Sequence, residues 1–237
     1  MRFPEFLKKN GTIGFVAPSF GCNIEPYKTS FNHALEKFHD MGYQTMLGPN
    51  CFEGSGIGIS NMPEKCAAEL NKMYLSDEAD ALISCGGGEL MCEILDDVDF
   101  DAIKAAKPKW YMGYSDNTNF TFLLTTICDV ASIYGPCAGT FGMEPWDESI
   151  EDSFSLFAGK KLTMQSYPLW EKEGLRDEEH PLEPYNLTEQ SLVRGFLTQK
   201  DQAGELQAVE TEGTIEFKGR LIGGCMDCLV NLTGTKF

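Results

Sequence analysis

Basic residues are scarce in this sequence. The 237 residues include 19 Lys and Arg against 36 Asp and Glu, which gives a formal net charge of −17 at pH 7. A surface with this charge repels phosphate backbones and anionic lipid headgroups. The composition therefore argues against a protein that binds nucleic acid or a membrane surface, and it says little about which small molecule is bound.

Long apolar stretches are also missing. No run of residues approaches the roughly 18 uninterrupted apolar positions of a transmembrane helix. The first nine residues, MRFPEFLKK, contain no apolar core of the kind that a signal peptide needs. We therefore expect a cytoplasmic protein without a membrane span.

Nine cysteines are present, an odd number without the regular spacing of a disulfide framework. In a cytoplasmic protein such residues are expected to be reduced and mostly buried. Cys225 and Cys228 form one Cys-x-x-Cys pair, but two further ligands at zinc-site spacing are lacking. We predict no metal and no organic cofactor, while a redox role for the pair stays open.

Short apolar strands alternate five times with amphipathic helices. Helical spacing of apolar residues over 31–41 stops at Gly42, and a second helix is expected from Pro63. The alternation predicts an α/β protein of the flavodoxin or Rossmann-like kind, with a parallel sheet covered by helices on both faces. The first strand is followed by PSFGC rather than Gly-x-Gly-x-x-Gly, which argues against a nucleotide-binding Rossmann enzyme. The predicted strands lie at 12–17, 43–47, 80–85, 110–112 and 132–136.

The composition changes after residue 161. Residues 165–190 contain three prolines and an acidic cluster, which indicates a linker or an exposed loop. Strand-like pieces follow at 207–209 and 214–217. We predict an α/β domain over residues 1–164, and a linker with an incomplete β-rich second domain over 165–237.

Ser115 lies where a predicted strand turns into a predicted helix. The apolar run 110–112 is broken by Gly113, and the apolar residues after Asp116 have helical spacing. Serine nucleophiles of α/β hydrolases lie on such a turn, although the second glycine of their pattern is Asn117 here. The same residues also suit a helix cap at Ser115 or Asp116. The local pattern does not choose between a cap and a nucleophile.

The residues 113–118, Gly-Tyr-Ser-Asp-Asn-Thr, resemble the nucleophile segment of the LD-carboxypeptidase family of serine peptidases, which includes the microcin C immunity peptidases. GTIGFVAPS at 11–19 and GRLIGGCMDCLVNLTGT at 219–235 are similar to two further segments of that family. The resemblance covers nearly the whole chain. It implies that Ser115 is the nucleophile, that Ser19 lies at the substrate crevice, and that the protein is a homodimer.

Three glycines, residues 86–88, follow the third predicted strand. Glycines let backbone amides approach a ligand closely, although a simple tight turn is the plain alternative. In the family that the sequence resembles, a Gly-Gly loop at this place supplies an amide to the oxyanion hole. The resemblance therefore assigns that role to Gly87 or Gly88, paired with the amide of Asp116.

The family completes a Ser-Glu-His triad with residues beyond its Gly-Thr segment. This sequence ends at Phe237, two residues past that segment, and no position matches the glutamate or the histidine. We therefore expect a truncated and nearly inactive polypeptide, because a serine without its base loses several orders of magnitude in rate. The competing explanation is a natural short form with a different base or a binding role.

The predicted function is that of a serine carboxypeptidase or amidase. The resemblance implies a small substrate, either a murein LD-peptide, as in peptidoglycan recycling, or an aminoacyl-nucleotide of the microcin C type. Two alternatives stay open. One is a non-catalytic peptide-binding module of the same fold, and the other is an amidotransferase-like domain that uses a cysteine such as Cys85.

Overall fold

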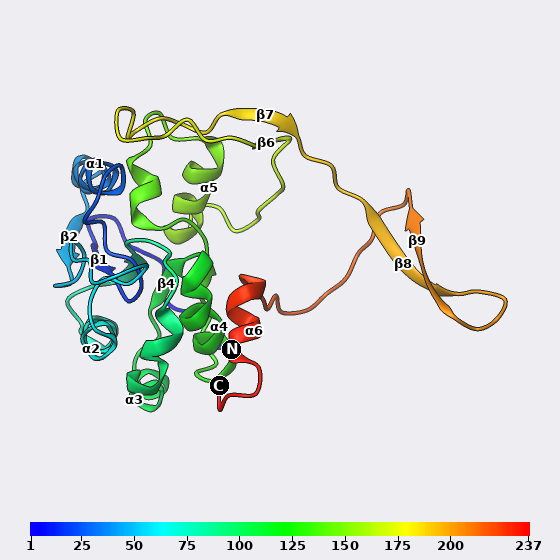
Figure 1. Cartoon of the computed structure of the whole chain (residues 1–237), viewed down its shortest axis with the longest axis horizontal. Helices are drawn as coiled ribbons and strands as arrows, with labels where there is room; N and C mark the ends of the chain where they lie inside the picture. The colour runs from blue at the N-terminus through cyan, green and yellow to red at the C-terminus, as the bar shows by residue number, and fades with distance from the viewer. The chain divides into compact units, whose positions relative to one another are not determined.

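Five parallel strands form the central sheet of this computed structural model, which describes all residues from 1 to 237 (Figure 1). The strand order is β2-β1-β3-β4-β5, the order of doubly wound flavodoxin-like sheets. The predicted α/β class and its parallel sheet are confirmed. The strands are β1 (Thr12–Val16), β2 (Gln44–Leu47), β3 (Ala81–Ser84), β4 (Trp110–Gly113) and β5 (Ile133–Tyr134).

Helices cover both faces of this sheet, as predicted. One face packs against α1, α5 and η3, and the other against α2, η1, α3 and α4 (Figure 1). Successive side chains of a strand point to opposite faces. Ala81 and Ile83 therefore join one hydrophobic cluster while Leu82 joins the other. The elements are α1 (Tyr27–Asp40), α2 (Pro63–Leu75), η1 (Met91–Asp97), α3 (Phe100–Ala105), η2 (Ser115–Asn117), α4 (Thr118–Thr126), η3 (Ala138–Gly142), α5 (Glu148–Phe157) and α6 (Met226–Leu232).

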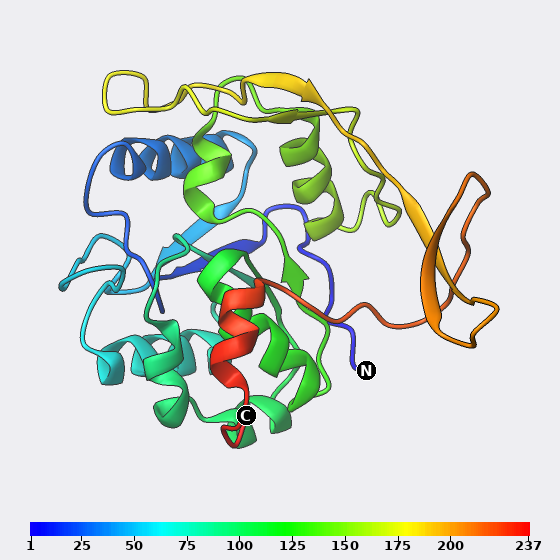
Figure 2. The same cartoon turned by 45° about the vertical axis from the view of Figure 1, so that its right-hand side comes forward.

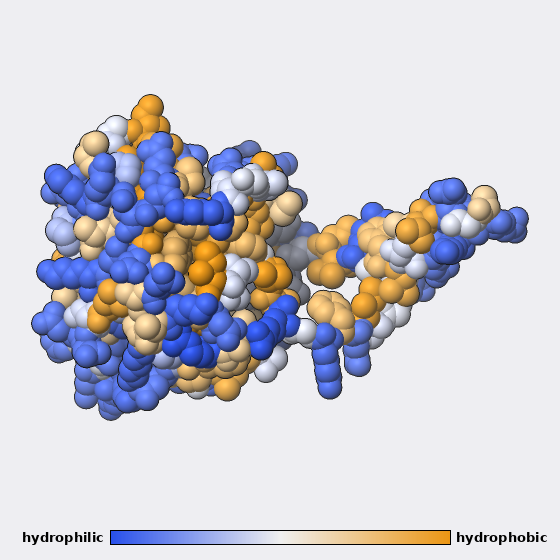
Figure 3. Space-filling model, turned by 90° about the horizontal axis from the view of Figure 1, so that it is seen from below, coloured by the Kyte–Doolittle hydropathy of each residue, from blue (hydrophilic) through white to orange (hydrophobic).

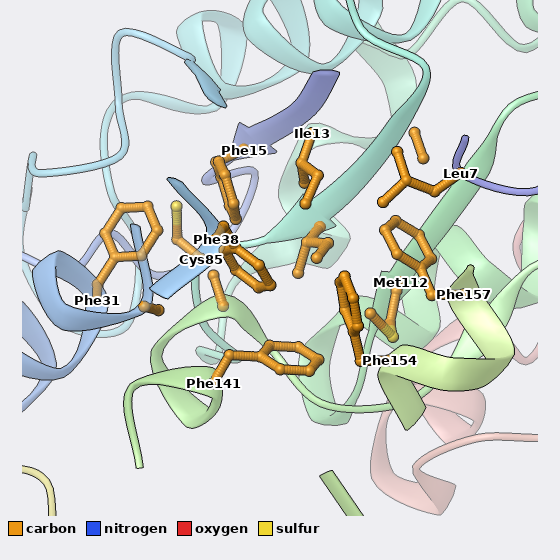
Figure 4. Close-up of a cluster of buried hydrophobic side chains, with 14 of the residues drawn as sticks. Leu7, Ile13, Phe15, Phe31, Phe38, Cys85, Met112, Phe141, Phe154 and Phe157 are labelled. Carbon is orange, nitrogen blue, oxygen red and sulfur yellow. The ribbon is translucent and has the colours of Figure 1, made fainter. Parts of the chain in front are cut away.

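Aromatic rings fill the core between the sheet and the α1–α5 face (Figure 4). Phe38 of α1 is fully buried, and its ring centroid lies 5.8 Å from that of Phe15, 5.4 Å from Phe141 and 5.5 Å from Phe154. These rings come from a strand and three different helices. Their packing fixes the sheet whose carboxyl edge carries the candidate site.

The chain divides into two compact units. The larger unit comprises residues 1–165, 175–185 and 222–237, and the smaller unit comprises 166–174 and 186–221. The larger unit thus includes α6. The division into domains at residue 164 stays a prediction. None of the helices combines the length and the apolarity that crossing a bilayer requires.

The smaller unit contains two antiparallel strand pairs, β6 (Leu169–Glu171) with β7 (Leu187–Gln190), and β8 (Gly195–Lys200) with β9 (Leu206–Thr211). The β-rich character expected for this part is therefore present. The strand-like piece predicted at 214–217 is not a strand. Apolar side chains such as Phe196 and Leu206 are exposed on the β8–β9 hairpin, where Figure 3 shows hydrophobic residues at the surface.

Candidate active site

Ser115 lies on a sharp turn between β4 and α4. Its φ angle is +60°, in the left-handed region of backbone conformation that residues other than glycine rarely adopt. Such strained positions cluster at functional sites, and a plain helix cap has no need of one. A Cβ on Gly113 would lie only 2.8 Å from the Asn117 side chain. The backbone at residue 113 can therefore approach Asn117 this closely only because the residue is glycine.

Asn117 occupies the position of the second glycine of the hydrolase pattern. Its Nδ2 donates to the carbonyl oxygens of Gly86 at 2.8 Å and Tyr114 at 3.1 Å, and its Oδ1 accepts a hydrogen bond from the Tyr111 hydroxyl. The side chain is fully buried. Asn117 therefore ties the triple-glycine loop to the serine turn, a role that the sequence analysis missed.

The triple-glycine loop lies directly against Ser115. A Cβ on Gly87 would be 3.3 Å from Ser115 Oγ and 3.2 Å from Ser115 Cβ. None of the backbone N–H groups of Gly87, Gly88 and Asp116 donates a hydrogen bond in the structure. Unpaired amides beside a hydroxyl are the donors that an oxyanion formed at that hydroxyl requires.

Ser115 and the glycines line one cavity of about 440 Å³. This volume is in the range of small-molecule sites, which are typically about 300–1,000 Å³. The cavity lies beyond the carboxyl ends of β3 and β4, where ligands of open α/β sheets bind. Its other lining residues are Phe20, Tyr27, Ile57, Gly58, Cys85, Gly86, Glu89, Tyr114, Cys137, Gly139, Thr140 and Arg176.

The Asp116 carboxylate is buried and accepts hydrogen bonds from residues in several parts of the fold. It accepts hydrogen bonds from the Ser19 hydroxyl, the Met91 backbone N–H at 2.8 Å and the Asn119 side chain at 2.9 Å. Ser19 is fully buried and does not line the cavity. Its hydroxyl lies behind Gly88, where a Cβ would be only 2.0 Å away. A direct contact between Ser19 and a substrate stays a prediction.

The Ser115 turn is also supported from the C-terminal segment. Helix α6 lies beside α4 in both Figure 1 and Figure 2. The Cys225 N–H donates to Thr118 Oγ1 at 2.8 Å, and Thr118 Oγ1 donates to the Ser115 carbonyl oxygen at 2.7 Å. Gly224 is in contact with Thr118, and a Cβ there would lie 2.4 Å from Thr118 Cγ2. Only the family resemblance pointed to this segment.

No side chain is placed as a base for Ser115. Its Oγ takes part in no hydrogen bond, and none of the three histidines lines the cavity. His33 Nδ1 lies 2.7 Å from the Gly142 carbonyl oxygen, and His180 Nδ1 lies 3.1 Å from an Asp177 carboxylate oxygen. His39 is exposed. The described residues therefore provide a hydroxyl and oxyanion donors without a base that is hydrogen-bonded to that hydroxyl.

Seven of the nine cysteines are buried, as predicted. Burial raises the pKa of the Cys85 thiol well above its usual value and that of Cys137 to about 12. Since the thiolate is the reactive form, both cavity thiols are weak nucleophiles near neutral pH. Burial likewise raises the pKa of Cys228 to about 12. This environment disfavours the amidotransferase-like alternative based on Cys85.

Replacement of Ser115 by glycine is expected to stabilise the fold. Glycine adopts φ of +60° without the steric cost that a Cβ carries, which is about 1 kcal/mol per residue. The matched control is Ser115→Ala, which also removes the hydroxyl but keeps the Cβ. In urea denaturation, the free energy of unfolding of Ser115→Gly should exceed that of Ser115→Ala by about 1 kcal/mol. Equal stabilities would contradict backbone strain at this turn.

A family model described as the LD-carboxypeptidase N-terminal domain matches residues 13–135. The microcin C7 self-immunity protein MccF of Escherichia coli is 26% identical over 234 residues, which are 98% of this chain and 63% of that protein. The probable murein peptide carboxypeptidase of Bacillus subtilis is 29% identical over 140 residues, which are 58% of this chain and 41% of that protein. The chain thus spans less than two thirds of either relative.

Solved structures of MccF share the fold. A mutant of the microcin C7 self immunity protein MccF in complex with adenosine monophosphate has a TM-score of 0.80 at 23% identity, covering 99% of this chain and 66% of that one. MccF in complex with glutamyl sulfamoyl guanosine has a TM-score of 0.79 at 23% identity, covering 98% and 65%.

Proposed function

Because the chain belongs to the LD-carboxypeptidase family, we propose that it is a serine-type hydrolase that cleaves an amide bond with Ser115 as the nucleophile. One observation carries this proposal. The Ser115 hydroxyl lies unpaired on a strained turn and faces a glycine loop whose amides are also unpaired, on the wall of one cavity.

In this mechanism Ser115 Oγ attacks the substrate carbonyl carbon and becomes bonded to it. The negative charge that develops on the carbonyl oxygen is stabilised by the amide of Gly87 or Gly88 together with that of Asp116. The amine leaves with a proton, and a water molecule then hydrolyses the acyl-enzyme. The proton of Ser115 needs an acceptor that the described residues do not place nearby, so turnover by these residues alone is slow.

The proposed substrate is a murein-type LD-peptide or an aminoacyl-nucleotide. The first class is supported by the Bacillus relative, whose name is that of a murein peptide carboxypeptidase. The second is supported by MccF, whose structures include complexes with adenosine monophosphate and with sulfamoyl nucleotides. A homodimer, which the family resemblance implies, and a cytoplasmic location, which the sequence predicts, are part of the same proposal.

A fluorophosphonate probe tests this proposal. The folded protein should be modified at Ser115 in preference to its other serines, because unpaired backbone amides there face the phosphoryl oxygen of the probe. Peptide mass spectrometry locates the adduct, and Ser115→Ala is the control. Labelling of the protein unfolded in urea gives the reactivity of Ser115 when the amides of the folded site no longer surround it. Equal modification of Ser115 in folded and unfolded protein would refute a preorganised nucleophile.

The absence of a base beside Ser115 favours one other candidate, a peptide-binding module of the same fold. It would bind ligand in the same cavity without forming any probe adduct at Ser115. Reaction of the probe with thiols alone would point instead to the cysteine-dependent alternative, against which the burial of Cys85 argues.

A further inference from the structure

Arg176 is the only basic residue that lines the cavity of Ser115. Its guanidinium carbon lies 5.5 Å from the centroid of the Tyr27 ring, and Tyr27 packs edge-on against Phe20 with their ring centroids 5.2 Å apart. The guanidinium makes no hydrogen bond or ion pair with the protein. An aromatic platform thus holds a positive charge whose five N–H donors are all available.

The segment that carries Arg176, residues 175–185, belongs to the larger unit, and its backbone is hydrogen-bonded to other parts of that unit. The Pro181 carbonyl oxygen accepts a hydrogen bond from Ser30 Oγ at 2.5 Å, and the Leu182 carbonyl oxygen accepts one from the Glu144 N–H at 2.9 Å. The segment that places Arg176 in the cavity lining is therefore hydrogen-bonded to other parts of the fold, although sequence analysis treated it as a linker or an exposed loop.

The neighbouring carboxylate does not neutralise Arg176. Asp177 Oδ1 accepts hydrogen bonds from the backbone N–H groups of Glu179 at 2.9 Å and His180 at 2.7 Å. These bonds lower the pKa of Asp177, and the bond from the His180 N–H contributes most. The Asp177 carboxylate is therefore hydrogen-bonded to the backbone of the turn that it begins. Glu89 is the one acidic residue of the cavity lining, and it is exposed.

A cation in this cavity matters because the rest of the protein carries a large negative charge. With a formal net charge of −17, the surface as a whole repels anions. An anionic ligand therefore needs a local positive group in order to bind. A guanidinium is suited to this task because its donors pair with two oxygens of a carboxylate or phosphate at once.

We propose that Arg176 is the specificity-determining residue of this cavity, and that it selects substrates with a carboxylate or phosphate on the part that lies against Tyr27. This inference deepens the proposed hydrolase function and rests on it. The shared chemistry is an oxyanion with two accessible oxygens. It is found in the terminal carboxylate of an LD-peptide and in the phosphate of an aminoacyl-nucleotide.

Two matched pairs of probes test the assignment by calorimetric titration of the 237-residue chain. The first pair is N-acetyl-L-lysyl-D-alanine and its C-terminal amide, and the second is adenosine monophosphate and adenosine. In at least one pair the anionic probe should bind about tenfold more tightly than its neutral partner. The pair that shows this preference identifies the source of the anion.

Arg176→Gln should reduce the affinity ratio of that pair to about one while the affinity of the neutral probe stays the same. Arg176→Lys keeps the charge without the planar fork and should retain part of the preference. Arg194→Gln removes the same charge from the residue just before β8, where Arg194 pairs with Glu210, and should leave the ratio unchanged. Thermal unfolding of each variant shows that it is folded.

The proposal is overturned if Arg176→Gln keeps the preference, if the wild-type protein prefers neither anion, or if it binds none of the four probes. Fluorophosphonate labelling separates this failure from failure of the hydrolase function. Labelling of Ser115 without an Arg176-dependent preference rejects the anion site alone. A preference that depends on Arg176 without labelling of Ser115 retains the anion site and rejects the nucleophile.

Discussion

The 237-residue chain by itself is expected to hydrolyse an LD-peptide or an aminoacyl-nucleotide roughly 10⁴ to 10⁶ times more slowly than a serine peptidase with a complete triad. Ser115 and the unpaired amides provide attack and oxyanion stabilisation, but no described side chain accepts the serine proton. The three histidines are engaged elsewhere or exposed. Some rate above that of the uncatalysed reaction should survive, because oxyanion donors act without a base.

The pH dependence of the rate distinguishes this situation from a working triad. With histidine as the base, the rate reaches a plateau above the histidine pKa, which is about 6.5 when unperturbed. Without a base the proton must leave to hydroxide, so the rate should rise about tenfold per pH unit through that range. Ser115→Ala measures the background. Brisk turnover with a plateau near neutral pH, lost in Ser115→Ala, would contradict the expectation.

Gly88→Ala is expected to have the largest effect on folding among changes at the site, a loss of roughly 2–5 kcal/mol in the free energy of unfolding. Gly88 has a φ of +129°, and a Cβ there would lie 2.0 Å from Ser19 Oγ and 2.7 Å from the Gly58 carbonyl oxygen. The loop must therefore move. That movement displaces the Ser19 hydroxyl from Asp116 and the loop amides from Ser115, so labelling of Ser115 should also fall.

Gly56→Ala is the matched control for this prediction. Gly56 also has a positive φ, +75°, but a Cβ there would meet nothing within 4 Å. The control therefore carries the backbone cost of about 1 kcal/mol without the steric clash. Urea denaturation of both variants separates the two causes. Equal losses of stability in Gly88→Ala and Gly56→Ala would show that the loop accepts a side chain at Gly88.

Periodic patterns in the sequence were sufficient for the architecture. All five central strands lie within a few residues of their predicted positions, and the sheet is parallel as expected. The helix predicted over 31–41 is α1, and the helix expected from Pro63 is α2, which begins at that residue. These features depend on local spacing, because a strand buried on both faces and a helix buried on one leave different apolar repeats. Where the local signal was weak, as at 214–217, the predicted strand was wrong.

The sequence by itself also determined that Ser115 would lie between a strand and a helix, and that three glycines would follow the third strand. It could not decide between a cap and a nucleophile, since that depends on a φ angle of +60° and on which groups surround the hydroxyl. Those surroundings come from distant segments. Asn117 binds the Gly86 carbonyl, Gly224 packs on Thr118, and Arg176 lies over Tyr27.

Only the tertiary structure decided these contacts. Hydrogen bonds and close approaches between residues far apart in sequence leave no periodic trace, because each depends on the path of the chain through the whole fold. The same reason explains why the sequence treated residues 165–190 as a linker or exposed loop, while part of that segment places a guanidinium in the candidate active site.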